Sequence, residues 1–378
     1  NPEHYQEARA EIYNHNLPVW STYEPGSTFK IITLAAALNE GKVNLKHDHF
    51  FDPGYIDVAG TKLHCWKRGG HGSESFLQVV QNSCNPGFVA LGERLGKKKL
   101  FSYIHQFGFG KKTGIDLQGE ASGILFKESK VGPLELATTA FGQGVSVTAI
   151  QQVMAVSAAI NGGYLYEPYL AKAWVNPITH NVIERNTPHL KRRVISGETS
   201  KKVRHALETV VAKGTGRAAF HEGYRIGGKT GTAQKVKNGS YSKNEYVLSF
   251  IGFAPADNPQ IVVYVAIDGA KNAPQFGGQV VAPITGDIIA DSLQAMGVKK
   301  RKNQIEKEKR WNDPVTVKVP NLIGLTKKDL RGSLFSGLRL DAEGKGDVVI
   351  DQSPKPGTKL ERGSTIRIYM GDKKQKED

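Results

Sequence analysis

The sequence has no run of apolar residues long enough to cross a bilayer, which excludes a membrane-spanning helix within its 378 residues. It also lacks a positively charged start followed by an apolar segment, and it does not begin with methionine. We therefore expect the chain to be the soluble part of a longer protein, with any export signal or membrane anchor upstream of Asn1. The missing span does not fix where the protein works.

Aromatic residues do not interleave with the basic clusters, and no recognisable nucleic-acid-binding module is present. The formal net charge of +15 could supply the attraction to phosphate on which such binding depends. Without those aromatic residues we interpret the clusters as a solvated face and expect no nucleic-acid partner. Attraction to an anionic cell surface is the alternative. The clusters comprise Lys98-Lys99, Lys111-Lys112, residues 191–193 and residues 299–302.

What is present is an ordinary globular composition, with 39% hydrophobic and 23% charged residues. Apolar periodicity and turn residues predict both helices and strands, and the last two strands form an antiparallel hairpin. The mixture predicts the α+β class. Helices are expected over residues 27–39, 75–81 and 149–161, and strands over residues 225–233, 247–253 and 261–267.

The composition of the chain changes near residue 296. Residues 1–295 are predicted to form one large domain. Residues 296–314 are rich in Lys, Arg, Glu and Asn, which predicts a charged linker or a solvated helix. Residues 315–372 predict a compact module with one helix packed on three short strands. The tail, residues 373–378, is too polar to fold alone.

The first chemical motif is Ser27-Thr28-Phe29-Lys30. On a helix, residues three apart share one face, so the Ser27 hydroxyl and the Lys30 amine can meet. The helix N-terminus adds free N–H groups and a partial positive field beside the serine oxygen. A lysine desolvated near another cation loses its proton more easily, so Lys30 is a candidate base for a Ser27 nucleophile. Alone, this spacing also arises by chance in most proteins.

Two further motifs follow, Ser83-Cys84-Asn85 and Lys229-Thr230-Gly231-Thr232. The first could relay a proton through its hydroxyl and hold a peptide carbonyl through its amide. Taken alone, a capping role at a loop explains it better. In the second, Gly231 would let a substrate backbone lie against the strand edge, while Lys229 and Thr232 bind a carboxylate. A bulge or close strand packing is the alternative for that glycine.

The order S-x-x-K, S-x-N, K-T-G is the signature of penicillin-binding proteins and serine β-lactamases. Residues 1–295 resemble the transpeptidase domain of class B penicillin-binding proteins, notably over residues 23–30 and 141–148, and in particular the sporulation-specific branch. The C-terminal module resembles a PASTA domain. The resemblance implies an antiparallel sheet flanked by helices, with further strands, a pedestal and a membrane anchor upstream of this chain. It also implies an extracytoplasmic location, at the forespore membrane for the sporulation branch.

The same resemblance implies a function. The chain is expected to be a D,D-transpeptidase that cross-links peptidoglycan stem peptides ending in D-Ala-D-Ala through a serine acyl-enzyme, for synthesis of the spore cortex. A β-lactam would acylate the same serine and stay bound. No cofactor is expected, and a glycan polymerase is an expected partner.

The roles carry over residue by residue onto the three motifs. The oxyanion hole would be formed by two backbone N–H groups. The residues are Ser27 as nucleophile, Lys30 as base, Ser83 and Asn85 as relay and substrate holder, Lys229, Thr230, Gly231 and Thr232 as substrate-binding residues, and Ser27 and Thr232 as the oxyanion hole.

Other functions share parts of this pattern. A β-lactamase needs a base for deacylating water, but neither Glu128 nor Glu135 has the E-x-x-L-N context of that family. A D,D-carboxypeptidase differs only in its acceptor, which these motifs do not specify. A non-catalytic receptor for peptidoglycan or antibiotic is a third alternative. The PASTA-like module could bind muropeptide or β-lactam, but we favour a structural role.

The sequence contains two cysteines, Cys65 and Cys84, and Cys84 is the middle residue of the second motif. In an extracytoplasmic protein they are candidates for a disulfide that would tether a catalytic loop to residues 63–66. We expect oxidation to lower activity and an extracytoplasmic thiol-disulfide reductase to restore it. Two inert buried thiols are the alternative.

Several histidines lie near Cys65, namely His47, His49, His64 and His71. No pair among them has a convincing ligand spacing, so the sequence predicts no metal site.

Overall fold

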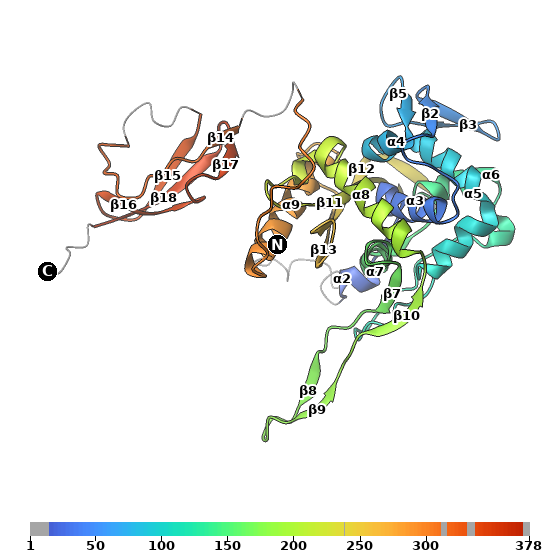
Figure 1. Ribbon diagram of the computed structural model, residues 1–378, viewed down its shortest axis with the longest axis horizontal. Helices are drawn as coiled ribbons and strands as arrows, with labels where there is room; N and C mark the ends of the chain where they lie inside the picture. Colours follow the sequence, from blue (N-terminus) through green and yellow to red (C-terminus); the bar gives the residue numbers. More distant parts are fainter. Residues whose placement is uncertain (1–14, 238, 311–315, 331–336, 373–378) are drawn as a thin grey trace. The chain divides into compact units, whose positions relative to one another are not determined.

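An antiparallel sheet carries the last of the three motifs. The computed structural model describes residues 15–237, 239–310, 316–330 and 337–372, which belong to two compact units, Asn1–Glu308 and Lys309–Asp378 (Figure 1). The sheet lies in the first unit, in the order β11-β12-β13, and its strands are β11 (Gly227–Lys237), β12 (Ser240–Ala254) and β13 (Ile261–Asp268). The pairing of β12 with β13 confirms the predicted hairpin.

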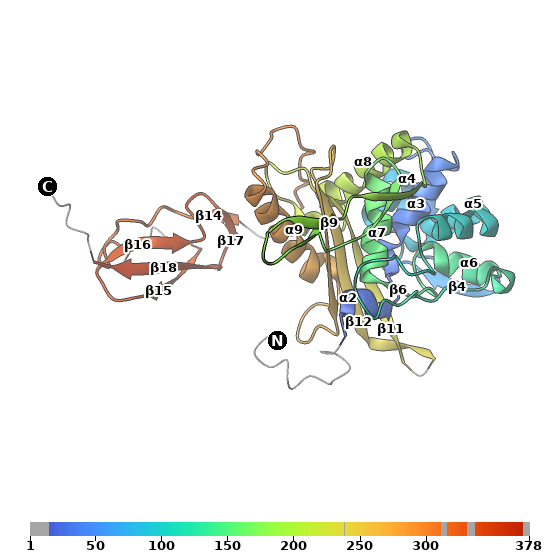
Figure 2. The same ribbon diagram turned by 90° about the horizontal axis from the view of Figure 1, so that it is seen from below.

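Alternating residues of β12 send apolar side chains to the two faces of the sheet. Leu248 and Phe250 are buried on the face covered by helix α9 (Gly277–Ala295), together with its Ile289. Ile251 and Phe253 are buried in the larger core on the opposite face, among the other helices. Figure 2 shows α9 on one side of the sheet and α3 and α7 on the other. The predicted α+β class, with helices flanking an antiparallel sheet, is confirmed.

The helices of the larger core begin at recognisable signals. Reciprocal hydrogen bonds in capping boxes start α4 at Ser75 with Gln78, and α7 at Thr148 with Gln151. The helices are α2 (Leu17–Trp20), α3 (Lys30–Asn39), α4 (Phe76–Asn82), α5 (Asn85–Gln106), α6 (Pro133–Ala140), α7 (Ala149–Ile160) and α8 (Gly197–Lys213), with short 3-10 turns η2 (Gly26–Thr28), η3 (Glu128–Lys130) and η4 (Arg217–Ala219).

The first motif differs from its predicted local structure. A single helix was expected from Ser27, but α3 begins at Lys30 and the serine lies in the 3-10 turn η2. The cause is Gly26, whose φ of 53° turns the chain into the serine before the α-helical hydrogen bonds begin. The turn holds the serine at the foot of a helix that is buried from Lys30 to Leu38.

Short antiparallel pairs of strands lie outside the main sheet of the first unit. Two of them, β2 with β5 and β3 with β4, lie beside α4 and α5, and two others form the long ribbon at the bottom of Figure 1. The pairs are β1 (Thr22–Tyr23) with β6 (Val147–Thr148), β2 (His49–Asp52) with β5 (Gly72–Ser75), β3 (Tyr55–Val58) with β4 (Thr61–His64), β7 (Tyr164–Glu167) with β10 (His189–Arg193), and β8 (Ala173–Val175) with β9 (Val182–Arg185).

Residues 299–308 of the charged stretch after α9 run along the rest of the first unit. A charged linker and a solvated helix were the two alternatives predicted for this stretch. Its described residues 299–310 contain no helix. The Arg301 N–H donates to Gly223 O at 2.8 Å and its guanidinium pairs with Asp257 at 2.7 Å, while the Glu308 N–H donates to Ala212 O at 2.9 Å. Two backbone hydrogen bonds and this ion pair thus hold the stretch against the rest of the first unit.

The second unit has its own core of Val319, Leu322, Val349, Ile366 and Ile368. The three predicted strands are present, together with a further pair. The predicted helix is not found among the described residues of this unit, and residues 331–336 and the tail 373–378 lie outside them. The strands are β15 (Arg339–Glu343), β18 (Thr365–Gly371) and β16 (Val348–Ser353) in that order, and β14 (Thr316–Lys318) with β17 (Lys359–Glu361).

Within the described residues, no helix combines the length and the apolar character that a bilayer span requires.

Candidate active site

The Ser27 turn is held by its backbone. The Gly26 N–H donates to Gly142 O at 3.0 Å, and the Thr28 hydroxyl donates to Pro25 O at 2.9 Å. Thr28 is fully buried, whereas Ser27 is partly exposed. The turn therefore presents the serine at the surface end of a buried helix.

Lys30 follows one helical turn later and is completely buried. Its amine donates to Ser83 O at 2.8 Å, to Asn85 Oδ1 at 2.7 Å and to Ser83 Oγ at 3.2 Å. None of these hydrogen bonds is made with Ser27. Burial lowers the pKa of Lys30 to about 7, against the opposing effect of the Cys84 and Cys65 thiols.

Lys229 reaches the same place from the sheet. It is also buried, and its amine donates to Ser83 Oγ at 2.7 Å and to Thr230 O at 3.3 Å. Burial and then the nearby charge of Lys30 lower its pKa well below the ordinary value. The Ser83 hydroxyl is thus the acceptor for both lysines, and the three motifs meet at this one oxygen.

The loop between α4 and α5 positions the second motif. Ser83 adopts a left-handed backbone with φ of 55°, which ends α4 and turns the chain into α5. Cys84 caps α5, since its sulfur accepts the Gly87 N–H at 3.4 Å. Asn85 is anchored on its other side, where its amide donates to His64 O at 3.1 Å. The side chain that caps α5 is thus that of Cys84, not the Ser or Asn of the capping alternative. Ser83 contacts both buried lysines, and Asn85 contacts Lys30.

The third motif lies on the edge strand β11, next to the Ser27 turn. A Cβ on Gly231 would lie 2.2 Å from Ser249 Oγ and 3.1 Å from Thr28 Cγ2, so the close-packing alternative for this glycine holds. A Cβ on Gly26 would lie 3.4 Å from Thr232 O. The Ser27 turn and the Gly231-Thr232 segment are therefore in direct backbone contact.

The two hydroxyls of this motif already have partners. Thr232 Oγ1 accepts the Gly277 N–H at 3.2 Å, and Thr230 Oγ1 lies 3.0 Å from Thr215 Oγ1. Thr232 is partly exposed and Thr230 is buried, so of the two only Thr232 is open to a ligand.

The sequence interpretation missed Glu24, a carboxylate beside the Ser27 turn. It accepts hydrogen bonds from the Gly144 N–H at 2.9 Å and the Tyr241 hydroxyl at 3.2 Å, and burial raises its pKa. It thereby ties residues 141–144 and strand β12 to the turn. Its position just before Pro25-Gly26 was the available signal.

The two cysteines lie close together and are both free thiols. Their sulfur atoms are within 4.8 Å of each other and of side chains from Asp52 and His71. A hydrogen bond with Cys84 is the largest factor that lowers the pKa of Cys65 to about 5, against the effect of burial. The two sulfur atoms are thus neighbours, but no disulfide joins them.

Comparison with known proteins identifies the class. Residues 1–290 match the penicillin-binding protein transpeptidase domain, and residues 317–372 match the PASTA domain. The chain therefore belongs to the penicillin-binding protein transpeptidase family, as the three motifs predicted.

Among individual relatives, the chain is 63% identical to stage V sporulation protein D of Bacillus subtilis (strain 168), over 377 residues. The match covers 100% of this chain and 58% of that protein, so the chain spans little more than half of its relative. It is also 33% identical to the peptidoglycan D,D-transpeptidase FtsI homolog of Mesostigma viride, over 74% of this chain and 50% of the relative.

Solved structures agree with the fold. Penicillin-binding protein 3 of Mycobacterium tuberculosis, complexed with aztreonam, superposes with a TM-score of 0.70 at 30% identity, over 78% of this chain and 67% of that one. The transpeptidase domain of penicillin-binding protein 3 from Burkholderia pseudomallei gives 0.68 at 30% identity, over 76% and 84%.

The fit of β11 against the Ser27 turn can be tested with Gly231→Ala. The added methyl meets Ser249 Oγ and Thr28, so we expect the free energy of unfolding to fall by about 1–3 kcal/mol in urea denaturation. Adding Ser249→Ala to the same chain removes the nearer contact and should recover part of the loss, with Ser249→Ala alone as the control. Unchanged stability of Gly231→Ala would contradict the packing.

Proposed function

We propose that the first unit is a serine-type D,D-transpeptidase that cross-links peptidoglycan stem peptides ending in D-Ala-D-Ala. The observation that carries the proposal is the Ser83 hydroxyl, which accepts hydrogen bonds from both Lys30 and Lys229 beside the Ser27 turn. Membership of the transpeptidase family supports it. Similarity to stage V sporulation protein D supports a role in sporulation, and we extend the proposal to synthesis of the spore cortex.

In the proposed acylation, the neutral form of Lys30 takes the proton of Ser27 as its oxygen attacks the carbonyl between the two D-alanines. The N–H groups of Ser27 and Thr232 stabilise the negative oxygen that develops. The intermediate collapses to an ester on Ser27, and the terminal D-alanine leaves after its amine receives a proton through Ser83. The amine of a second stem peptide then attacks the ester, forms the cross-link and releases the serine.

The substrate would lie along β11, which pairs on one side only among the described strands. A peptide can add to such an edge through main-chain hydrogen bonds. Lys229 provides positive charge behind the strand, and Thr232 would hold the terminal carboxylate, while the Asn85 amide would hold a peptide carbonyl.

The proposed transpeptidase differs from a D,D-carboxypeptidase in the group that attacks the Ser27 ester. In a carboxypeptidase that group is water instead of the amine of a second stem peptide. A non-catalytic receptor would bind or be acylated without releasing D-alanine. We favour transpeptidation because the relative from Mesostigma viride is named as a peptidoglycan D,D-transpeptidase homolog. The same proposal has four further parts. They are a membrane anchor preceding this chain, a location outside the cytoplasmic membrane, a glycan polymerase partner and a structural role for the PASTA domain.

The nucleophile can be tested by mass spectrometry of the intact chain after mixing with penicillin. Wild type should gain one adduct, mapped to the peptide that contains Ser27, and should release D-alanine from a D-Ala-D-Ala peptide. Ser27→Ala should lose both, by at least about 10³-fold. Ser102→Ala, at an exposed position on α5, is the matched control and should retain both. Acylation of Ser27→Ala at wild-type rate would overturn the assignment.

The role of Lys30 predicts a pH dependence. Burial lowers its pKa to about 7, with Lys229, Cys84 and Cys65 as the other titratable groups that face it. The amine is protonated below that pH and neutral above it. The rate constant for acylation by a fluorescent penicillin should therefore rise roughly tenfold per pH unit up to about 7 and then level off. A rate independent of pH across this range would rule out Lys30 as the base.

The cysteine pair predicts redox control of the same activity. Loss of two electrons and two protons to an oxidant would join the sulfurs at about 2.05 Å. Because Cys84 caps α5 between Ser83 and Asn85, drawing its sulfur toward Cys65 should displace both neighbours. We expect penicillin labelling of Ser27 to fall on oxidation and to recover with a dithiol reductant, while Cys65→Ser should not respond. Equal labelling in both states would sink this proposal.

A further inference from the structure

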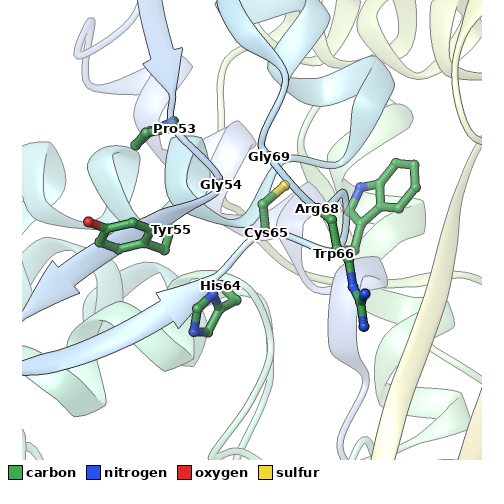
Figure 3. Close-up of a pocket in the computed structure, with 8 residues that line it drawn as sticks. All are labelled: Pro53, Gly54, Tyr55, His64, Cys65, Trp66, Arg68 and Gly69. Atoms are coloured by element: carbon green, nitrogen blue, oxygen red, sulfur yellow. The ribbon is translucent and has the colours of Figure 1, made fainter.

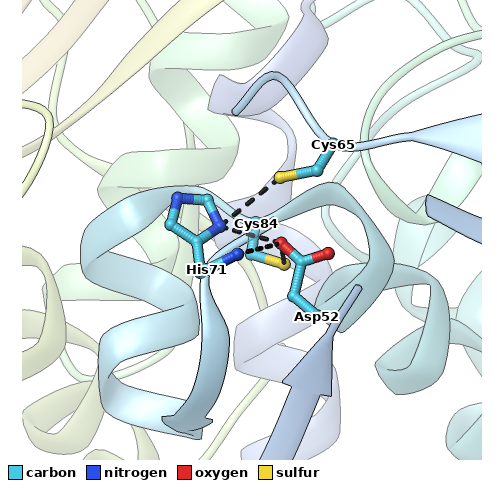
Figure 4. Close-up of side chains that lie close together, drawn as sticks. All are labelled: Asp52, Cys65, His71 and Cys84. Carbon is cyan, nitrogen blue, oxygen red and sulfur yellow. Dashed lines mark hydrogen bonds and ion pairs between the residues drawn. The ribbon is translucent and has the colours of Figure 1, made fainter. Parts of the chain in front are cut away.

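Four side chains with metal-binding atoms converge behind the second motif (Figure 4). They come from four separate segments: Asp52 ends β2, Cys65 follows β4, His71 precedes β5, and Cys84 caps α5. One ligand atom from each lies within 4.8 Å of all the others. Three of the side chains are buried and His71 is nearly so.

Three distances between these atoms are close to those of a tetrahedral zinc site, and the others are no longer than 4.8 Å. His71 Nδ1 lies 3.4 Å from Cys65 Sγ and 2.9 Å from Asp52 Oδ2, which in turn lies 3.3 Å from Cys84 Sγ. Zinc bonds of normal length place such ligand atoms about 3.4–3.8 Å apart. These three contacts would need to lengthen by at most about 0.5 Å to accept the ion. We propose that Asp52, Cys65, His71 and Cys84 bind a structural zinc ion.

The donor set favours zinc among the common metals. Two thiolates and an imidazole are soft to borderline ligands, which calcium and magnesium do not select. A single carboxylate completes four-coordination, as expected of a structural site with no open position. Binding displaces the two thiol protons, so two thiols and one Zn²⁺ give a dithiolate complex and two H⁺.

The surroundings hold the ligands in place. Asp52 Oδ1 accepts the Gly54 N–H at 2.8 Å, which fixes the carboxylate and turns its other oxygen toward the cluster. That oxygen also accepts the backbone N–H of His71 at 3.1 Å. Trp66 covers the imidazole edge-on, with ring centroids 5.5 Å apart. The orientation of two ligands thus depends on groups outside the ligand set.

A route to the site exists from the surface. A pocket of about 410 Å³ borders Cys65 and Gly54, and His64 and Arg68 also line it (Figure 3). Cys65 is 8% exposed there, whereas Cys84 is completely buried. A hydrated ion would therefore meet Cys65 first and reach the remaining ligands behind it.

Zinc binding would oppose disulfide formation, since both thiols would be held as ligands. It would also join β2, β4 and β5 to the N-cap of α5, next to Ser83 and Asn85. The inference does not depend on the proposed transpeptidase activity, because its measurements concern the metal and the thiols alone.

The test is a metal titration of the full, untagged chain, reduced and freed of metal. Wild type should bind one equivalent of Co²⁺ with the visible bands of a tetrahedral site and the near-ultraviolet absorption of cobalt-thiolate bonds, and Zn²⁺ should displace it. Cys65→Ser and His71→Ala should weaken binding by more than about 100-fold. His64→Ala, which removes an exposed neighbour outside the cluster, is the matched control and should bind as wild type does.

A second measurement on the wild type avoids the risk that a variant fails to fold. Zn²⁺ should slow the reaction of both thiols with a disulfide reagent at least tenfold, and a chelator should restore it. Reduced wild type that gives no tetrahedral cobalt spectrum would overturn the proposal. So would thiol reactivity that is indifferent to zinc, or equal loss of binding in His64→Ala.

Discussion

Two buried lysine amines donate to one serine hydroxyl, and the arrangement of the first unit follows from keeping that oxygen between them. Lys30 comes from the central helix, Lys229 from the sheet and Ser83 from the loop between two other helices. Two charged ammonium groups so close together and away from water would be costly. Their lowered pKa values relieve that cost and provide a neutral amine inside a folded protein near neutral pH.

The loop that carries Ser83 is consequently the least replaceable part of the site. Its backbone is left-handed at a residue that is not glycine, a conformation that needs support from its surroundings. The support comes from the next residue, since Cys84 caps α5 and contacts Asp52. The thiol in the middle of the second motif thus belongs to a polar cluster, and the loop that carries Ser83 rests on that cluster rather than on the apolar core alone.

Local structure could be predicted from the sequence where one pattern dominates. The hairpin of β12 and β13 followed from β-rich runs around a Pro-rich turn, and α7 followed from its apolar spacing and terminal glycines. The start of α3 was predicted three residues early, because a 3-10 turn leaves the same apolar pattern as a helix. The helix of the second unit stays a prediction.

The site was harder to derive from the sequence, because its contacts are distant along the chain. Lys229 and Ser83 are 146 residues apart, and only a known order of motifs could join them. For the polar cluster there was no such guide. The sequence drew attention to His71 and both cysteines, but Asp52 has no signal of its own, and four ligands on four segments have no characteristic spacing.

The Ser27 turn keeps its shape without help from the side chain that it presents. Gly26 and Gly142 meet backbone to backbone, Thr28 ties the turn to Pro25, and no hydrogen bond that we identify in the described residues uses the Ser27 hydroxyl. If that hydroxyl becomes an ester, the fold therefore loses nothing. A serine on such a turn can be esterified and released repeatedly without breaking a hydrogen bond that holds the turn in shape.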